Sequence, residues 1–154
     1  RIVDVTFEAP KPEPPASPTL IIGLRSEGEE PAEARAVTDR IQRDGLMARV
    51  QLERLDTSSP KPIPLWRVSD DGRSQVKLST DIVGERLWGS DVAVNTLAEA
   101  GLFSQRLSYS ELQWASVGLG ERGRYRLRID LLENRPDLEG LQMDLMVGYQ
   151  QLGK

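Results

Sequence analysis

The sequence contains neither histidine nor cysteine. Without histidine the chain lacks the side chain that most often serves as a general base near neutral pH, and the two absences together remove the preferred ligands of zinc. Without cysteine it can form neither a disulfide bond nor a thiolate nucleophile. These absences exclude many classes of enzyme, and they favour a domain that binds or assembles over one that catalyses a reaction.

Aromatic residues are also scarce, at 5% of the chain. Aliphatic side chains must therefore supply most of the buried area. With 154 residues, 38% of them hydrophobic, the chain is long enough for one domain with a substantial core and short for two. We therefore predict a single domain over residues 1–154, with a proline-rich connection at residues 9–18.

The chain has no long apolar run and no excess of positive charge. No hydrophobic stretch approaches the roughly 20 residues that a transmembrane helix requires, so we expect no membrane span. The net charge is −4 with both signs interspersed, which does not favour nucleic acid as a partner, because such binding depends on Lys and Arg meeting phosphate. The first residues lack the pattern of a secretory signal, and the sequence does not indicate a cellular compartment.

The first half of the chain predicts a strand followed by a strand-helix-strand unit. Residues 1–8 alternate apolar and polar side chains, which is typical of a half-buried strand. The prolines of residues 9–18 predict an extended connection, or alternatively a ligand for an aromatic groove of a partner. Residues 20–24 predict a strand, Pro31 and Gly45 mark the two ends of a helix, and residues 48–55 predict the next strand.

The middle of the chain predicts a hairpin and a second helix. Residues 65–68 and 75–79 predict two strands joined by a turn at residues 69–72. Ser90 is placed to cap a helix that ends at Gly101. Residues 41–47 and 97–103 also match at a shift of 56 positions, which leaves open whether the two helical units are an internal repeat.

The last third alternates twice between apolar and polar residues. Tyr125, Leu127 and Ile129 lie on one side of a predicted strand, and a second alternating run follows at residues 141–149. We expect these two strands to form a C-terminal β-hairpin whose apolar faces share one core.

Together these elements predict an α+β fold, with a mixed, largely antiparallel sheet, two helices and the additional C-terminal hairpin. The order β-α-β-β-α-β is ferredoxin-like. Residues 32–50, following the strand that begins Leu20-Ile21-Ile22-Gly23, resemble the peptidoglycan-binding SPOR domain, which has such halves and often follows a proline-rich linker. The first strand and the terminal hairpin depart from that domain, so the resemblance assigns no family.

Two short motifs have structural explanations. Residues 118–123 match the pattern G-x-G-x-x-G, but an arginine-rich strand follows where a dinucleotide site needs a helix. Asp70 and Asp71 precede Gly72, as expected for a tight turn between strands. The sequence therefore predicts no catalytic residue, no cofactor-binding residue, no metal ligand and no cofactor.

One surface feature is a candidate for binding. Alternate residues of the predicted strand at residues 122–128 are arginines, so their side chains point the same way. The residues are Arg122, Arg124, Arg126 and Arg128. This row presents either a positive stripe to an anion or a solvated strand face neutralised by neighbouring carboxylates.

These observations favour a non-catalytic protein-interaction or assembly module that is part of a larger protein or complex, with a protein partner or self-association. One alternative is an anion- or glycan-binding domain that uses the arginine strand. The other is an enzyme that depends on carboxylates, with or without a divalent metal.

Overall fold

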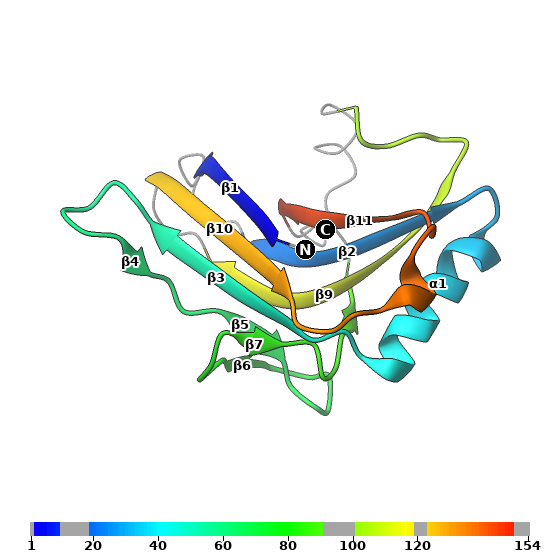
Figure 1. Cartoon of the computed structure of the whole chain (residues 1–154), viewed down its shortest axis with the longest axis horizontal. Coiled ribbons are helices and arrows are strands. Elements are labelled where there is room, and N and C mark those ends of the chain that lie inside the picture. The colour runs from blue at the N-terminus through cyan, green and yellow to red at the C-terminus, as the bar shows by residue number, and fades with distance from the viewer. Residues whose placement is uncertain (1, 10–18, 91–100, 119–122, 150–154) are drawn as a thin grey trace.

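The computed structural model describes residues 2–9, 19–90, 101–118 and 123–149. About half of the described residues lie in strands and 14% in helices, so the described part of the chain is mostly β. Two antiparallel sheets pack around a shared aliphatic core and form an open sandwich (Figure 1). All strand pairs among the described residues are antiparallel.

The first sheet, sheet A, is built around two long central strands. Its order is β1 (Ile2–Ala9), β10 (Gly123–Leu131), β3 (Ala48–Arg54) and β4 (Lys61–Pro62), and β7 (Ile82–Val83) also pairs with β3. The alternation of the sequence gives this sheet one apolar face, because the apolar residues of β1, β10 and β3 stand opposite one another in register.

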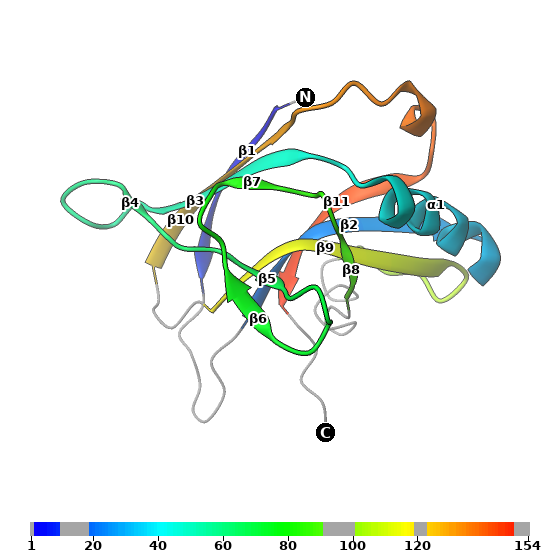
Figure 2. The ribbon, with the colours of Figure 1, turned by 90° about the horizontal axis from the view of Figure 1, so that it is seen from below.

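The second sheet, sheet B, contains the longest strands. Its order is β11 (Met143–Tyr149), β2 (Thr19–Gly28), β9 (Ser108–Gly118), β5 (Trp66–Val68) and β6 (Gln75–Lys77), and β8 (Trp88–Gly89) also pairs with β9. The short strands β5 to β8 lie in front when the molecule is seen from below, on the side away from β1 and β11 (Figure 2). In the described residues, β1 and β11 each pair with one strand and are therefore edge strands.

The α-helix α1 (Pro31–Asp44) connects β2 of sheet B to β3 of sheet A. It packs on β2 and β9 with a face that includes the buried residues Ala34, Thr38 and Ile41. The Ser26 hydroxyl donates a hydrogen bond of 2.6 Å to the Ala34 carbonyl, and the hydroxyls of Thr38 and Ser110 lie 2.7 Å apart. These bonds satisfy polar groups that packing against the sheet would otherwise leave buried and unpaired.

The predicted ferredoxin-like fold is wrong. Strands β2 and β3, which flank α1, belong to different sheets, so they do not form a parallel β-α-β unit. The sheets are antiparallel rather than mixed, and the described residues contain one α-helix and not two. The second helix was predicted mainly over residues 91–100, which lie outside the described residues. The same gap includes part of the segment 97–103 that matches residues 41–47 at a shift of 56 positions.

The predicted C-terminal hairpin is also wrong. Both strands exist as β10 and β11, but β10 lies in sheet A and β11 in sheet B. The connection between them contains a short 3-10 helix, η1 (Pro136–Leu138), and crosses from one sheet to the other. Two alternating strands with apolar faces bury those faces equally well side by side or across a core from each other, and here they take the second arrangement.

Several elements agree with the sequence patterns. The first strand, the strand at residues 20–24, the helix that begins at Pro31, the strand from residue 48 and the hairpin of β5 and β6 all exist. Gly45 ends α1 with a φ of 74°, and its N–H donates to the Ile41 carbonyl. Within the described residues, no helix combines the length and the apolar character that crossing a membrane requires.

Candidate binding groove

The arginine row lies on the outer face of sheet A, beside carboxylates from both neighbouring strands. Arg126 donates hydrogen bonds of 2.8 and 2.6 Å to the two carboxylate oxygens of Asp4 on β1. Arg128 lies 3.0 Å from the Glu53 carboxylate on β3, and Arg124 lies 3.9 Å from that of Glu8. Arg122 lies outside the described residues.

These pairs change the electrostatics of the row. The hydrogen bonds with Arg126 lower the pKa of Asp4, and the same contact raises the pKa of Arg126. An incoming anion would have to compete with the neighbouring carboxylates for the guanidinium groups. Anion or glycan binding at this row stays a prediction.

A different feature stands out at the open side of the sandwich, where the edge strands β1 and β11 flank the core. Val5 stands opposite Leu127 in the register of sheet A, and Leu145 and Val147 stand opposite Leu24 and Ile22 in sheet B. Opposed residues on antiparallel strands share a face, and Leu127, Leu24 and Ile22 are all buried in the core. The three edge residues therefore point toward the core side of their sheets.

These three side chains are nevertheless exposed. The exposed fraction is 43% for Val5, 36% for Leu145 and 40% for Val147. Their partners one strand further in are almost completely buried. We call this open side between β1 and β11 the seam, because here the two sheets do not close over the core.

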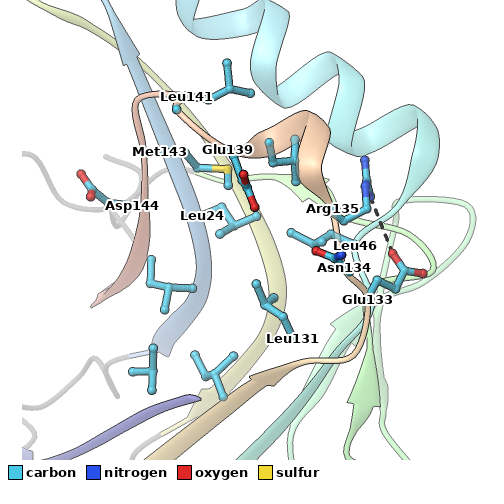
Figure 3. A pocket seen from close by; sticks show the side chains of 15 residues that line it. Leu24, Leu46, Leu131, Glu133, Asn134, Arg135, Glu139, Leu141, Met143 and Asp144 are labelled. Atoms are coloured by element: carbon cyan, nitrogen blue, oxygen red, sulfur yellow. Dashed lines mark ion pairs between the residues drawn. The ribbon is translucent and has the colours of Figure 1, made fainter. Parts of the chain in front are cut away.

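At one end of the seam lies a hollow of about 520 Å³, lined mainly by aliphatic side chains (Figure 3). Leu24 of β2, Leu46 and Ile129 of β10 lie deep in the sandwich, while Val3 and Leu145 belong to the edge strands. The connection from β10 to β11 supplies one wall. We call this hollow, together with the seam, the groove.

The mouth of the groove is acidic. Glu133, Glu139 and Asp144 belong to its lining together with one cation, Arg135, and the Asp144 carboxylate points away from the hollow to the outer side of β11 (Figure 3). Arg135 lies within 4.0 Å of the carboxylates of Asp44, Glu133 and Asp137, and its Nη1 donates to the Gly45 carbonyl at 2.6 Å. Its hydrogen bonds with Asp137 raise the pKa of Arg135 and lower that of Asp137.

Arg135 therefore holds the connection between β10 and β11 against the end of α1, and its charge is balanced locally. By contrast, Glu139 and Asp144 form no ion pair with any residue that the structure describes. The groove thus combines aliphatic walls with negative charge that is free to meet a cation.

The hollow is lined by apolar residues, by carboxylates, by Asn134 and by Arg135. Among the described residues that line it, none carries a hydroxyl or an amine that could act as a nucleophile. The described part of the chain also contains no group of three or more acidic side chains placed to hold a metal ion.

A larger hollow of about 800 Å³ lies between α1, β6 and β7 and is polar. Arg43, Arg67, Lys77 and Arg86 line it, with Asp70 and Glu85 as the acidic residues. Arg67 pairs with Asp70 at 3.2 Å, and Arg43 pairs with Asp44 at the same distance. These are exposed ion pairs at the surface, and they do not by themselves indicate a ligand.

Comparison with protein-family models, with curated proteins and with solved structures found no match for this chain.

Sequence reasoning singled out the arginine row and missed the groove. The signal for the edge residues was present, because the alternation around Val5 and around Leu145 correctly predicts strands with one apolar face. The alternation does not show that these two strands lie at edges, and this position is what leaves their apolar side chains exposed.

Proposed function

We propose that this domain is a non-catalytic protein-interaction module whose groove binds an extended apolar segment of another polypeptide. The observation that carries the proposal is the exposure of Val5, Leu145 and Val147 on the core side of the two edge strands. Covering these side chains would extend the existing core, and burial of apolar surface is the main favourable term in most protein association.

The charge around the groove favours a different polypeptide over a second copy of the same chain. Two copies would bring the acidic residues Glu139 and Asp144 of each mouth together, and each chain carries a net charge of −4. Juxtaposed like charges oppose association, whereas a segment with Lys or Arg beside its apolar residues would be attracted.

A small apolar molecule is the competing occupant, because a hollow of about 520 Å³ falls within the size range of small-molecule sites. Val5 and Val147 are exposed on the core side of the edge strands but do not line the hollow, so a ligand that fills only the hollow would leave them uncovered. An extended chain with side chains at regular intervals could reach both the hollow and these two residues.

The proposal is tested by selecting a displayed library of random 12-residue peptides on the immobilised domain. Val5→Glu places a charge on the core side of β1, while Thr6→Glu places the same charge on the outer side of the same strand. We expect selected peptides to bind Val5→Glu at least about tenfold more weakly than the wild type, as for a residue central to an interface, and to bind Thr6→Glu almost unchanged.

Circular dichroism and thermal melting would establish that both variants are folded, and Val147→Gln provides a second seam variant if Val5→Glu is not. Failure to enrich any peptide, or equal binding to the variants at Val5 and Thr6, would contradict the proposal. Displacement of a bound apolar dye by small apolar molecules, with no peptide bound, would assign the groove to a small ligand instead.

A further inference from the structure

The register of β11 with β2 determines which residues of β11 form main-chain hydrogen bonds with β2. The Glu27 N–H donates to the Gln142 carbonyl at 3.1 Å, and the register continues from there with Met143 opposite Ser26 and Asp144 opposite Arg25. In an antiparallel ladder, hydrogen-bonded pairs recur at every second residue. The even-numbered residues of β11 therefore direct their main-chain groups toward β2.

The odd-numbered residues of β11 direct their N–H and C=O groups to the free edge. Leu145 and Val147 belong to this set, so the residues with exposed apolar side chains also present to the seam main-chain groups that pair with no other described strand. A strand added at this edge would form hydrogen-bonded pairs with these two residues. The side chains opposite them would then point to the core side and cover the groove.

The other edge of the seam is less suited to strand addition. The N–H of Leu55 donates to the Arg124 carbonyl, so even-numbered residues of β10 pair with β3 and odd-numbered residues pair with β1. On β1 the main-chain groups that no described strand pairs are consequently those of Asp4, Thr6 and Glu8. Charged side chains along an edge discourage pairing with another strand.

We infer that the partner segment binds as an added β-strand on the free edge of β11, with apolar side chains facing the groove and Lys or Arg at positions that meet Asp144 and Glu139. This inference rests on the proposed function and specifies how the same groove is used. Asp144 lies between Met143 and Leu145 and points away from the core side, so an added strand would place an outward-facing side chain beside it. Opposite charges at such cross-strand positions stabilise pairing.

Amide hydrogen exchange measured by NMR, with the tightest peptide from the selection, tests the strand. We expect peptide binding to slow exchange at least about tenfold at the amides of Leu145 and Val147, because new main-chain bonds protect them. The amides of Thr6 and Glu8 on β1 serve as the matched control and should change little.

The possible outcomes separate the two proposals. A peptide that binds the groove without protecting Leu145 and Val147, or that protects Thr6 and Glu8 instead, would overturn strand addition on β11 and leave the proposed function standing. If no peptide binds at all, the proposed function itself fails.

The charge of the partner is tested by Asp144→Lys, with Asp39→Lys on the exposed face of α1 as a control for the same change in net charge. We expect the first variant to bind the selected peptide at least about tenfold more weakly at low salt, and the second to bind it with near wild-type affinity. Equal affinities for the two variants, or selected peptides without Lys or Arg, would overturn the basic partner.

Discussion

At the scale of single residues, Gly84 fixes the contact between the end of α1 and the short strands. Its φ is 104°, and a Cβ at this position would overlap the Leu46 carbonyl. The same carbonyl accepts a hydrogen bond of 2.9 Å from the indole N–H of the buried Trp114, and the Leu46 N–H donates to the Gly84 carbonyl. Gly84 is thus required both by its backbone conformation and by the close approach of Leu46.

We expect Gly84→Ala to lower the free energy of unfolding by more than about 2 kcal/mol, because the left-handed conformation is strained for alanine and the backbone must move. Urea denaturation measures this change. Gly89→Ala is the matched control, since a Cβ there meets no atom within 4 Å. Similar losses in the two variants would show that the close approach to Leu46 is not what requires glycine.

Gly45 and Gly84 differ in whether the local sequence predicts their role. Gly45 was predicted as the helix stop from its place after the last apolar residue of α1, and its positive φ agrees. Gly84 carries no such signal, because its constraint comes from Leu46 and Trp114, which are distant in the sequence and meet it only in the folded chain.

At the scale of elements, the outer face of sheet A is held by ion pairs across three strands. Asp4 on β1 pairs with Arg126 on β10, and Arg128 on β10 pairs with Glu53 on β3. The three described arginines of the row, Arg124, Arg126 and Arg128, thus each lie beside a carboxylate of an adjacent strand. This arrangement favours pairing of β1 in its observed register.

The pair of Asp4 and Arg126 makes a prediction about pH. Because the hydrogen bonds with Arg126 lower the pKa of Asp4 in the folded state, the stabilisation is fully present above the ordinary pKa of the unfolded carboxyl. It is lost as the pH falls through the lowered folded value. In a double-mutant cycle of Asp4→Asn and Arg126→Gln, we expect thermal melting to show coupling at neutral pH that decreases as the pH falls below the ordinary range of an aspartate carboxyl.

Salt provides the control for this pair. Both side chains are partly exposed, so 1 M salt should weaken the coupling at neutral pH through screening. A coupling that persists unchanged at low pH would show that packing, and not charge, links the two residues.

At the scale of the whole molecule, the two sheets share one core. The main cluster of buried residues contains Leu127 and Ile129 of sheet A together with Ile22, Leu24 and Trp114 of sheet B. Neither sheet can therefore expose its apolar face without exposing that of the other.

We expect unfolding to be a single cooperative transition. In the variant Trp66→Phe with Trp88→Phe, Trp114 is the remaining tryptophan and reports on the core between the sheets. The urea midpoints from Trp114 fluorescence and from far-UV circular dichroism should coincide. Two separated transitions would show that the sheets unfold independently.

The seam is also a property of the whole molecule. It exists because β1 and β11, from opposite ends of the chain, become edge strands on the same side of the sandwich (Figure 1). The proposed binding of a partner strand would use this geometry, which neither strand specifies alone.

The sequence by itself determined the local features: an aliphatic core, the alternating strands around Val5, Leu127 and Leu145, and a helix from Pro31 to its stop at Gly45. Such features depend on side-chain periodicity and on backbone preference, and both are properties of residues that are close together in the sequence. Only the tertiary structure decided that β2 and β3, and likewise β10 and β11, belong to opposite sheets. An alternating strand specifies which of its faces is buried but not which strand lies beside it, and the groove depends on that choice of neighbours.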